Sequence, residues 1–256
     1  MTSISSSIPH NIPYLTRAKK RPHSEVTADQ DSLHVIGYKV YKTAVKIPEE
    51  ILQELFKKSN KASAIFNYNE NTPKNDYKRR QYSLSAAKSN KVMRTFLESV
   101  NEFIHNNVSN VLKPNSWVAI HSLPGCQDQA AHCDYIPNKV LASVTDEQMP
   151  LSVIVCLMPG TRLNVWPNSI RLASLSATIV KKINPIPCEV VEMNVGDILV
   201  FRGDFIHAGS SYTKDNYRLH AFLDSDLVPR TPNRTWIIHK DGSEALKNVI
   251  LPKKPE

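Results

Sequence analysis

The sequence lacks the features that mark several common classes of protein. Its four cysteines, at positions 126, 133, 156 and 188, include no CxxC pair, so neither a zinc ribbon nor a disulfide framework is expected. Reduced thiols in an intracellular compartment are the default expectation for such a chain. Only seven glycines occur in 256 residues, which excludes collagen-like and glycine-rich low-complexity character.

Long apolar runs are also missing. The longest lies around LSVIVCLM, at 151–158, and has the length of a strand, whereas a membrane-spanning helix needs about 20 apolar residues. The N-terminus has no hydrophobic signal core, so secretion and a membrane partner are not expected, and the cytoplasm or nucleus remains. Residues 1–32 are Ser-rich and basic, which favours a disordered tail, with an organelle transit peptide or a nuclear import signal as alternatives.

The net charge of +8 leaves two interpretations open. Much of the positive charge lies in segments that read as tails or loops, namely 17–23, 74–80 and the C-terminal PKKPE. Such segments can bind an acidic partner such as nucleic acid, or they can form a solvated basic surface that aids solubility. Charge alone therefore gives a nucleic-acid partner only weak support.

The order of the expected elements predicts a mainly β fold with flanking helices. After the tail, residues 33–115 should contain a strand at 34–47, a helix beginning near Pro48, an exposed loop at 67–83 and a helix at about 88–107. Residues 116–226 alternate short β-rich runs with turns, as in SWVAIHSL, PLSVIVCLM and DILVFRG. About eight short strands at this spacing indicate a β-sandwich or barrel, and 227–256 forms a C-terminal extension.

One constellation in this β-rich part can carry chemistry. In AAHCDY, His132 and Asp134 are two residues apart, so an extended strand would place both side chains on one face. A distal His207 follows in GDILVFRGDFIHAG, and Arg218 lies in the apolar run YRLHAFLD, where a buried guanidinium needs a partner. Two histidines and one carboxylate form the facial triad that is diagnostic of non-heme Fe(II) oxygenases.

With these motifs, the sequence resembles the Fe(II)/2-oxoglutarate-dependent dioxygenases over about residues 116–225, and its spacing is most similar to the prolyl-4-hydroxylase-like branch. The resemblance implies a double-stranded β-helix core of the jelly-roll, cupin-like type. It implies that His132, Asp134 and His207 bind iron and act in catalysis. It also implies that Arg218 pairs with the distal carboxylate of 2-oxoglutarate, with O₂ as the second co-substrate.

Three further residues are candidates for binding the co-substrate. The family often has Ser or Thr two residues after this arginine, where this chain has His220, and an imidazole N–H can serve as the donor instead. Tyr135 follows the ligand aspartate, and Asn164 lies in RLNVWP, where a place in the core is the alternative for both. Asp224 stands where the related nucleic-acid demethylases carry a second arginine, which argues against that branch.

The resemblance implies an oxidoreductase that hydroxylates a side chain of a protein or peptide. Two alternatives stay open. One is an oxygenase that acts on nucleic acid, supported by the positive charge alone. The other is a metal-binding β-helix scaffold without turnover, against which the complete set of His, Asp, His and Arg argues.

Overall fold

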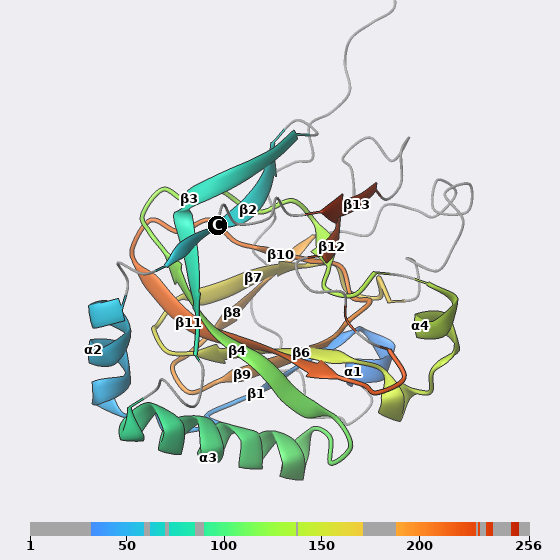
Figure 1. Cartoon of the computed structure of the whole chain (residues 1–256), viewed down its shortest axis with the longest axis horizontal. Coiled ribbons are helices and arrows are strands. Elements are labelled where there is room, and N and C mark those ends of the chain that lie inside the picture. The colour runs from blue at the N-terminus through green and yellow to red at the C-terminus, as the bar shows by residue number, and fades with distance from the viewer. Residues whose placement is uncertain are drawn as a thin grey trace, which may run out of the picture.

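The computed structural model describes residues 32–58, 62–69, 72–84, 90–136, 138–170, 188–228, 230, 234–237 and 247–250. Two antiparallel sheets face each other (Figure 1). The larger sheet contains, in spatial order, β1 (Tyr38–Tyr41), β9 (Ile198–Arg202), β6 (Leu151–Cys156), β11 (Asn216–Asp224), β4 (Lys113–Ser122), β3 (Thr72–Ser83) and β2 (Ser63–Asn69).

The smaller sheet contains β13 (Lys247–Ile250), β12 (Arg234–Ile237), β5 (His132–Cys133), β10 (His207–Gly209), β7 (Thr161–Val165) and β8 (Glu189–Met193). Neighbours in both sheets are antiparallel, and strands far apart in the sequence lie side by side. This arrangement is a double-stranded β-helix, which confirms the predicted fold class.

Helices cover the outer face of the larger sheet. Helix α3 (Lys91–Asn107) begins after Asn90, whose Oδ1 accepts a hydrogen bond from the Met93 N–H at 2.8 Å and so caps the helix. Its apolar stripe packs with α2 (Glu49–Lys58) on that face (Figure 1). The short helices are α1 (Ser32–Val35), α4 (Lys139–Ser143) and the 3₁₀ turn at Asp146–Gln148. Within the described ranges, no helix has both the length and the apolarity to cross a membrane.

The prediction of an exposed loop at 67–83 is wrong. Strands β2 and β3 form an antiparallel hairpin there, and β3 pairs with β4 as part of the larger sheet. One face of β3 looks toward the interior, where Arg79 is fully buried, whereas Tyr77 and Lys78 are exposed. The opposite face carries Tyr82, which packs against the helices.

Two other boundaries differ from the expectation. In the segment 34–47, only Tyr38–Tyr41 is a strand, and α1 precedes it. The C-terminal extension supplies β12 and β13 to the smaller sheet, with Ile237 paired with His132. The predicted tail at 1–32, except its last residue, and residues 171–187 of the predicted β-rich part lie outside the described residues.

The space between the sheets has two chemically different regions. On β6, β9, β7 and β8, apolar side chains from both sheets form one cluster, which includes Ile154, Leu163 and Phe201. On the adjacent strands β3, β4 and β11, the inward positions include the buried polar residues Arg79, Ser122 and Arg218. The apolar region holds the sheets together, and the polar region can receive a ligand.

Candidate metal centre

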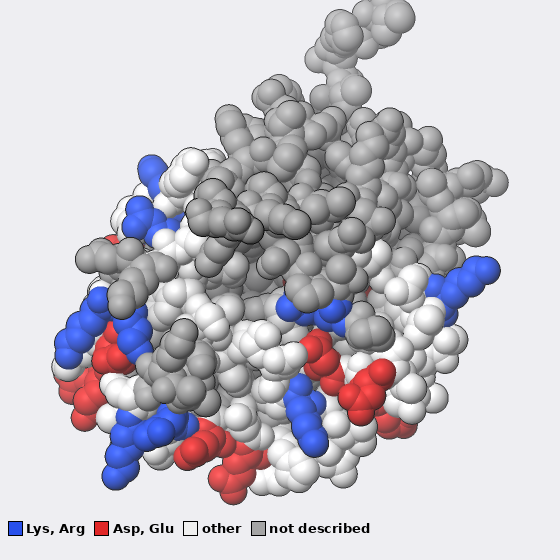
Figure 2. Space-filling model, in the orientation of Figure 1, with Lys and Arg blue, Asp and Glu red and all other residues white. Residues whose placement is uncertain are grey.

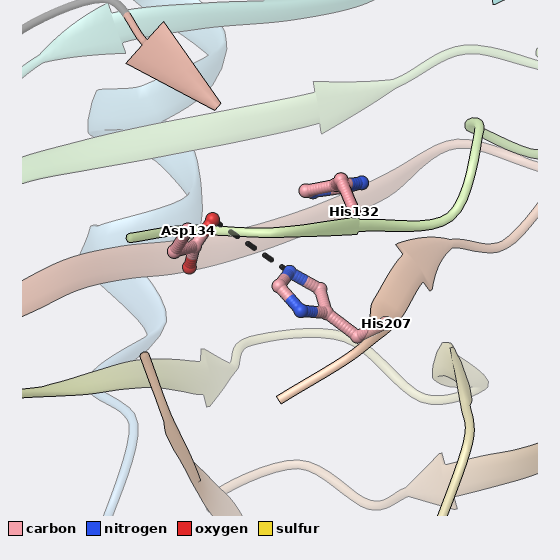
Figure 3. Close-up of side chains that lie close together, drawn as sticks. All are labelled: His132, Asp134 and His207. Atoms are coloured by element: carbon pink, nitrogen blue, oxygen red, sulfur yellow. Dashed lines mark ion pairs between the residues drawn. The ribbon is translucent and has the colours of Figure 1, made fainter. Parts of the chain in front are cut away.

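Three side chains that are distant in the sequence converge at the polar end of the interior. His132 lies on β5, Asp134 follows that strand, and His207 begins β10, directly opposite His132 in the register of the two strands (Figure 3). One ligand atom from each residue can be chosen so that all three lie within 4.8 Å of one another. All three residues are buried. The two imidazoles and one carboxylate thus form a group that can hold a single ion.

Hydrogen bonds determine which ring nitrogen of His132 and of His207 faces the space between the three side chains. His132 Nδ1 lies 2.7 Å from the carbonyl oxygen of Ala130, and His207 Nδ1 lies 3.1 Å from that of Phe205. A carbonyl oxygen can only accept, so each Nδ1 carries the proton and donates it. Each Nε2 therefore keeps its lone pair, as a metal ligand requires.

The two oxygens of Asp134 have different surroundings. Oδ2 accepts a hydrogen bond from the Ser152 hydroxyl at 2.6 Å and lies 3.5 Å from His220 Nε2. Oδ1 lies 3.7 Å from His207 Nε2 (Figure 3). Ser152 and His220 thus orient the carboxylate from behind while Oδ1 faces the imidazoles, an arrangement that is usual around metal ligands.

The electrostatics keep all three groups in the form that binds a cation. Burial lowers the pKa of His207 to about 3 and also lowers that of His132, so both rings are neutral at pH 7. Burial alone would raise the pKa of the Asp134 carboxyl, but the imidazoles of His207, His220 and His132 outweigh burial and lower it. The donors are therefore deprotonated before any metal arrives, as metal binding demands.

Arg218 is a buried cation with no anionic partner among the described residues. Its Nη1 donates to Ser122 Oγ at 2.9 Å, its guanidinium carbon lies 5.6 Å from the centre of the Tyr212 ring, and its Nε has no hydrogen-bond partner. Burial, and to a smaller extent the charge of Arg79, holds the pKa of Arg218 below its usual value. A carboxylate entering from outside would supply the missing counter-charge.

The other predicted contacts are placed differently. His220 shares the inward face of β11 with Arg218, but it contacts Asp134. Asn164 lies on the opposite face of β7 from the interior residues Leu163 and Val165, and its Oδ1 accepts from Ser210 Oγ at 2.7 Å. Asn164 therefore points away from His132, Asp134 and His207, because alternate side chains of a strand point to opposite faces.

Tyr135 is also outside the centre. Its hydroxyl donates to Asp224 Oδ1 at 2.5 Å, and its ring packs in a separate apolar cluster with Leu141, Met149 and Val228. Alternation along the chain again explains the result, since His132 and Asp134 share one side. Tyr135 therefore contacts Asp224 and this apolar cluster.

Sequence reasoning missed Ser152, Ser122 and Arg79, which contact the site residues or the segments that carry them. A signal existed for Ser152, which is the single hydroxyl residue in the apolar strand LSVIVC. For Arg79 there was none, because its partners, three main-chain carbonyl groups and the Cys126 sulfur, belong to segments far along the chain.

Comparisons with known proteins agree on the architecture. No protein-family model matches the chain, and no curated protein is similar to it in sequence. Among solved structures, AviO1 from Streptomyces viridochromogenes Tue57 is similar with a TM-score of 0.56 and 14% identity, over 81% of this chain and 100% of that one.

Two further structures contain ligands. HygX from Streptomyces hygroscopicus, with nickel and 2-oxoglutarate bound, has a TM-score of 0.53 and 12% identity, over 86% of this chain and 95% of that one. The epimerase SnoN, in complex with Fe³⁺, α-ketoglutarate and nogalamycin RO, has a TM-score of 0.51 and 13% identity, over 88% of this chain and 89% of that one. The chain has the fold of these proteins.

Proposed function

We propose that this chain is an Fe(II)- and 2-oxoglutarate-dependent oxygenase. One observation carries the proposal: the buried triad His132, Asp134 and His207 shares the interior with Arg218, a buried cation with no carboxylate partner among the described residues. Two nitrogens and one oxygen suit Fe(II) and do not saturate it. The guanidinium complements a dicarboxylate co-substrate. Its orphaned Nε and its lowered pKa both favour that pairing.

The chain's own residues would hold and orient the reactants. His132 Nε2, His207 Nε2 and Asp134 Oδ1 would bind the metal, and Arg218 would bind the distal carboxylate of 2-oxoglutarate. When bound, iron with 2-oxoglutarate and O₂ supplies hydroxylation of an unactivated C–H bond, with release of succinate and CO₂. Ser152 and His220 would keep Asp134 in the geometry that the metal needs. The buried walls would exclude water.

For the substrate, we propose a side chain of a protein or peptide. The support is the spacing of the HxD pair, the distal His207 and Arg218, which is most similar to the prolyl-4-hydroxylase-like branch. A small molecule is the second candidate, because HygX has been solved with hygromycin B bound and SnoN with nogalamycin RO. Both substrate classes require the same metal centre. They differ in the part of the protein that would have to cover the substrate at that centre.

The case for a nucleic-acid substrate is weaker than the composition implied. Arg79, in the basic segment 74–80, is fully buried and contributes nothing to a basic surface. On the face shown in Figure 2, acidic and basic side chains of the described residues are interspersed, without a broad area of one sign. Strong nucleic-acid binding usually needs such an area.

Succinate formation tests the proposal directly. The full chain, loaded with Fe(II) and supplied with 2-oxoglutarate and O₂, should release succinate slowly without a substrate and faster with the right one. His132→Ala and Asp134→Ala should abolish both rates, whereas His105→Ala, at an exposed position on α3, should leave them unchanged. Peptide, oligonucleotide and small-molecule panels in the same assay would identify the substrate class. Absence of succinate from the metal-loaded wild type under all conditions would support the scaffold alternative.

A further inference from the structure

We propose that Arg79 is a positioning residue for the metal centre: its guanidinium fixes the two segments that carry the ligands relative to each other. The inference rests on the proposed function only in that the triad must bind a metal. Arg79 belongs to β3 of the larger sheet, on a strand that carries no ligand, and its side chain reaches across the interior to the smaller sheet.

The hydrogen bonds of Arg79 end on both ligand-bearing segments. Nη2 donates to the carbonyl oxygen of Gln127 at 2.9 Å, in the loop that leads to His132 and Asp134. The same nitrogen donates to the carbonyl oxygen of Ser210 at 2.7 Å, and Nη1 donates to that of Gly209 at 3.2 Å, just after His207. A single planar group thus joins the two segments at three points.

Main-chain pairing between these segments is short, with an isolated bridge between Cys126 and Tyr212 at its far end. Strand β5 has two residues and β10 has three, and the register between them consists of one pair, His207 with His132. Further contacts reinforce this pair: Gln129 N–H donates to the Gly209 carbonyl at 2.8 Å, and Gly209 N–H donates to Gln129 Oε1 at 3.1 Å. Arg79 completes this set from the opposite sheet.

The packing at Gly209 shows how close the approach is. A Cβ atom at this position would overlap both Arg79 Nη1 and Gln129 Oε1. A larger residue at position 209 would therefore have to displace the guanidinium and the Gln129 amide from their hydrogen bonds. The fork geometry also matters, because a lysine ammonium cannot reach three carbonyl oxygens in one plane as a guanidinium does.

Metal affinity of the metal-free protein tests the inference without relying on turnover. Co(II) is the probe, with the dissociation constant measured by calorimetry and the ligand geometry followed in the visible absorption of the bound ion. Full-length wild type, Arg79→Gln and Arg79→Lys are compared at a temperature where near-ultraviolet circular dichroism shows each to be native. Both variants should bind Co(II) about tenfold to a hundredfold more weakly, the usual effect of removing a group that orients metal ligands.

Arg80→Gln is the matched control. Arg80 is the next residue on β3, only partly buried, and its Nε donates to the carbonyl oxygen of Tyr77 on the same strand. This variant loses the same charge from the same strand and should bind Co(II) as the wild type does. Equal binding by Arg79→Lys and wild type would show that charge, and not the three-point contact, is what matters, and would overturn the proposal.

A milder variant keeps the test decisive if Arg79→Gln does not fold. Gln129→Ala removes a bond between the same two segments and should weaken Co(II) binding about threefold to tenfold, with an altered absorption spectrum. Native Arg79→Gln, or failing that Gln129→Ala, with unchanged affinity and spectrum would refute the positioning role while leaving the proposed function intact. A wild type that binds no Co(II) would instead refute the proposed function.

Discussion

Two buried charge clusters in this fold differ in whether they are closed. Arg202, at the end of β9, donates through Nε and Nη2 to the two oxygens of Asp204, at 2.9 and 3.1 Å, and through Nη1 to Asp146 at 2.6 Å. Burial lowers the pKa of Arg202, but the two carboxylates outweigh burial and raise it. Arg218, at the other cluster, has a hydroxyl and an aromatic ring as neighbours, and its pKa is lowered.

The carboxylates show the same contrast. Both oxygens of Asp204 are taken by Arg202, whereas Asp134 uses one oxygen for Ser152 and turns the other toward the imidazoles. A buried charge without a counter-charge in the protein is costly to the fold. Such a charge is expected mainly where a bound ligand supplies the counter-charge. The first cluster is thus neutralised within the described residues, whereas the second leaves Arg218 without a carboxylate among them.

Removing the cation of the closed cluster should produce the largest effect. Arg202→Met leaves Asp204 buried without its partner, which should lower the free energy of unfolding by about 3 kcal/mol. Most of this cost belongs to Asp204, because Asp146 is partly exposed to water. Urea denaturation of the metal-free protein measures it. A loss below about 0.5 kcal/mol would break the comparison, because ordinary surface substitutions have effects of that size.

The corresponding change in the open cluster should affect ligand binding and leave the fold intact. Arg218→Met removes a buried charge that lacks a counter-ion, so the free energy of unfolding without ligand should not fall. Binding of 2-oxoglutarate should weaken about thirtyfold to a hundredfold, the usual worth of a charge-assisted pair of hydrogen bonds. Thermal shift against 2-oxoglutarate concentration measures this, with Arg202→Met as the contrasting variant. Equal stabilisation of Arg218→Met and wild type by 2-oxoglutarate would contradict the anchor role.

Ser152→Ala tests how the carboxylate of Asp134, in contrast to that of Asp204, is held in place. The change removes the hydroxyl that fixes Asp134 Oδ2 and should weaken Co(II) binding about tenfold. The loss should appear in calorimetric titration of the metal-free protein. Ser99→Ala is a suitable control, because that hydroxyl donates to a carbonyl oxygen within α3, remote from the centre. Unchanged affinity in Ser152→Ala would mean that His220 alone orients the carboxylate.

The pH dependence should be the smallest effect. The folded protein keeps His132 and His207 neutral, with the pKa of His207 lowered to about 3, whereas the unfolded chain protonates them near pH 6.5. The unfolded state therefore binds more protons below this value, so stability should fall as pH falls. The expected loss is roughly 1 kcal/mol between pH 7 and 6 for the metal-free protein. Denaturation curves at both values test this, and His207→Gln should remove about half of the loss.

Local patterns were enough to predict the parts of the site that depend on them. The HxD pair needs only strand alternation, and the apolar stripe of α3 needs only helical periodicity, so both are visible in the sequence. His207 was singled out by its distal place in GDILVFRGDFIHAG, and the resemblance implied its role, since no local pattern ties it to His132. The register between β10 and β5 brings the two together.

The remaining features depend on contacts between distant segments. A charged segment such as 74–80 looks like a loop, because nothing local indicates that Arg79 will find carbonyl partners more than forty residues away. Tyr135 was a candidate because it follows Asp134 in the sequence, and Asn164 because it lies in the strand-like run RLNVWP. The packing of the two sheets decides which face of each strand turns inward. Sequence spacing thus singled out the three residues that the fold brings together, while tertiary pairing decided which residues support them.

The place of β12 beside β5 has a consequence for synthesis. The strand that carries His132 has two neighbours, β10 and β12, and both leave the ribosome after it. Its backbone groups therefore wait for partners made later, and Ile237, opposite His132, is among the last. A nascent chain halted before Arg234 would contain His132, Asp134 and His207 and still lack the strand that pairs with β5, so the candidate metal centre should be completed late in synthesis.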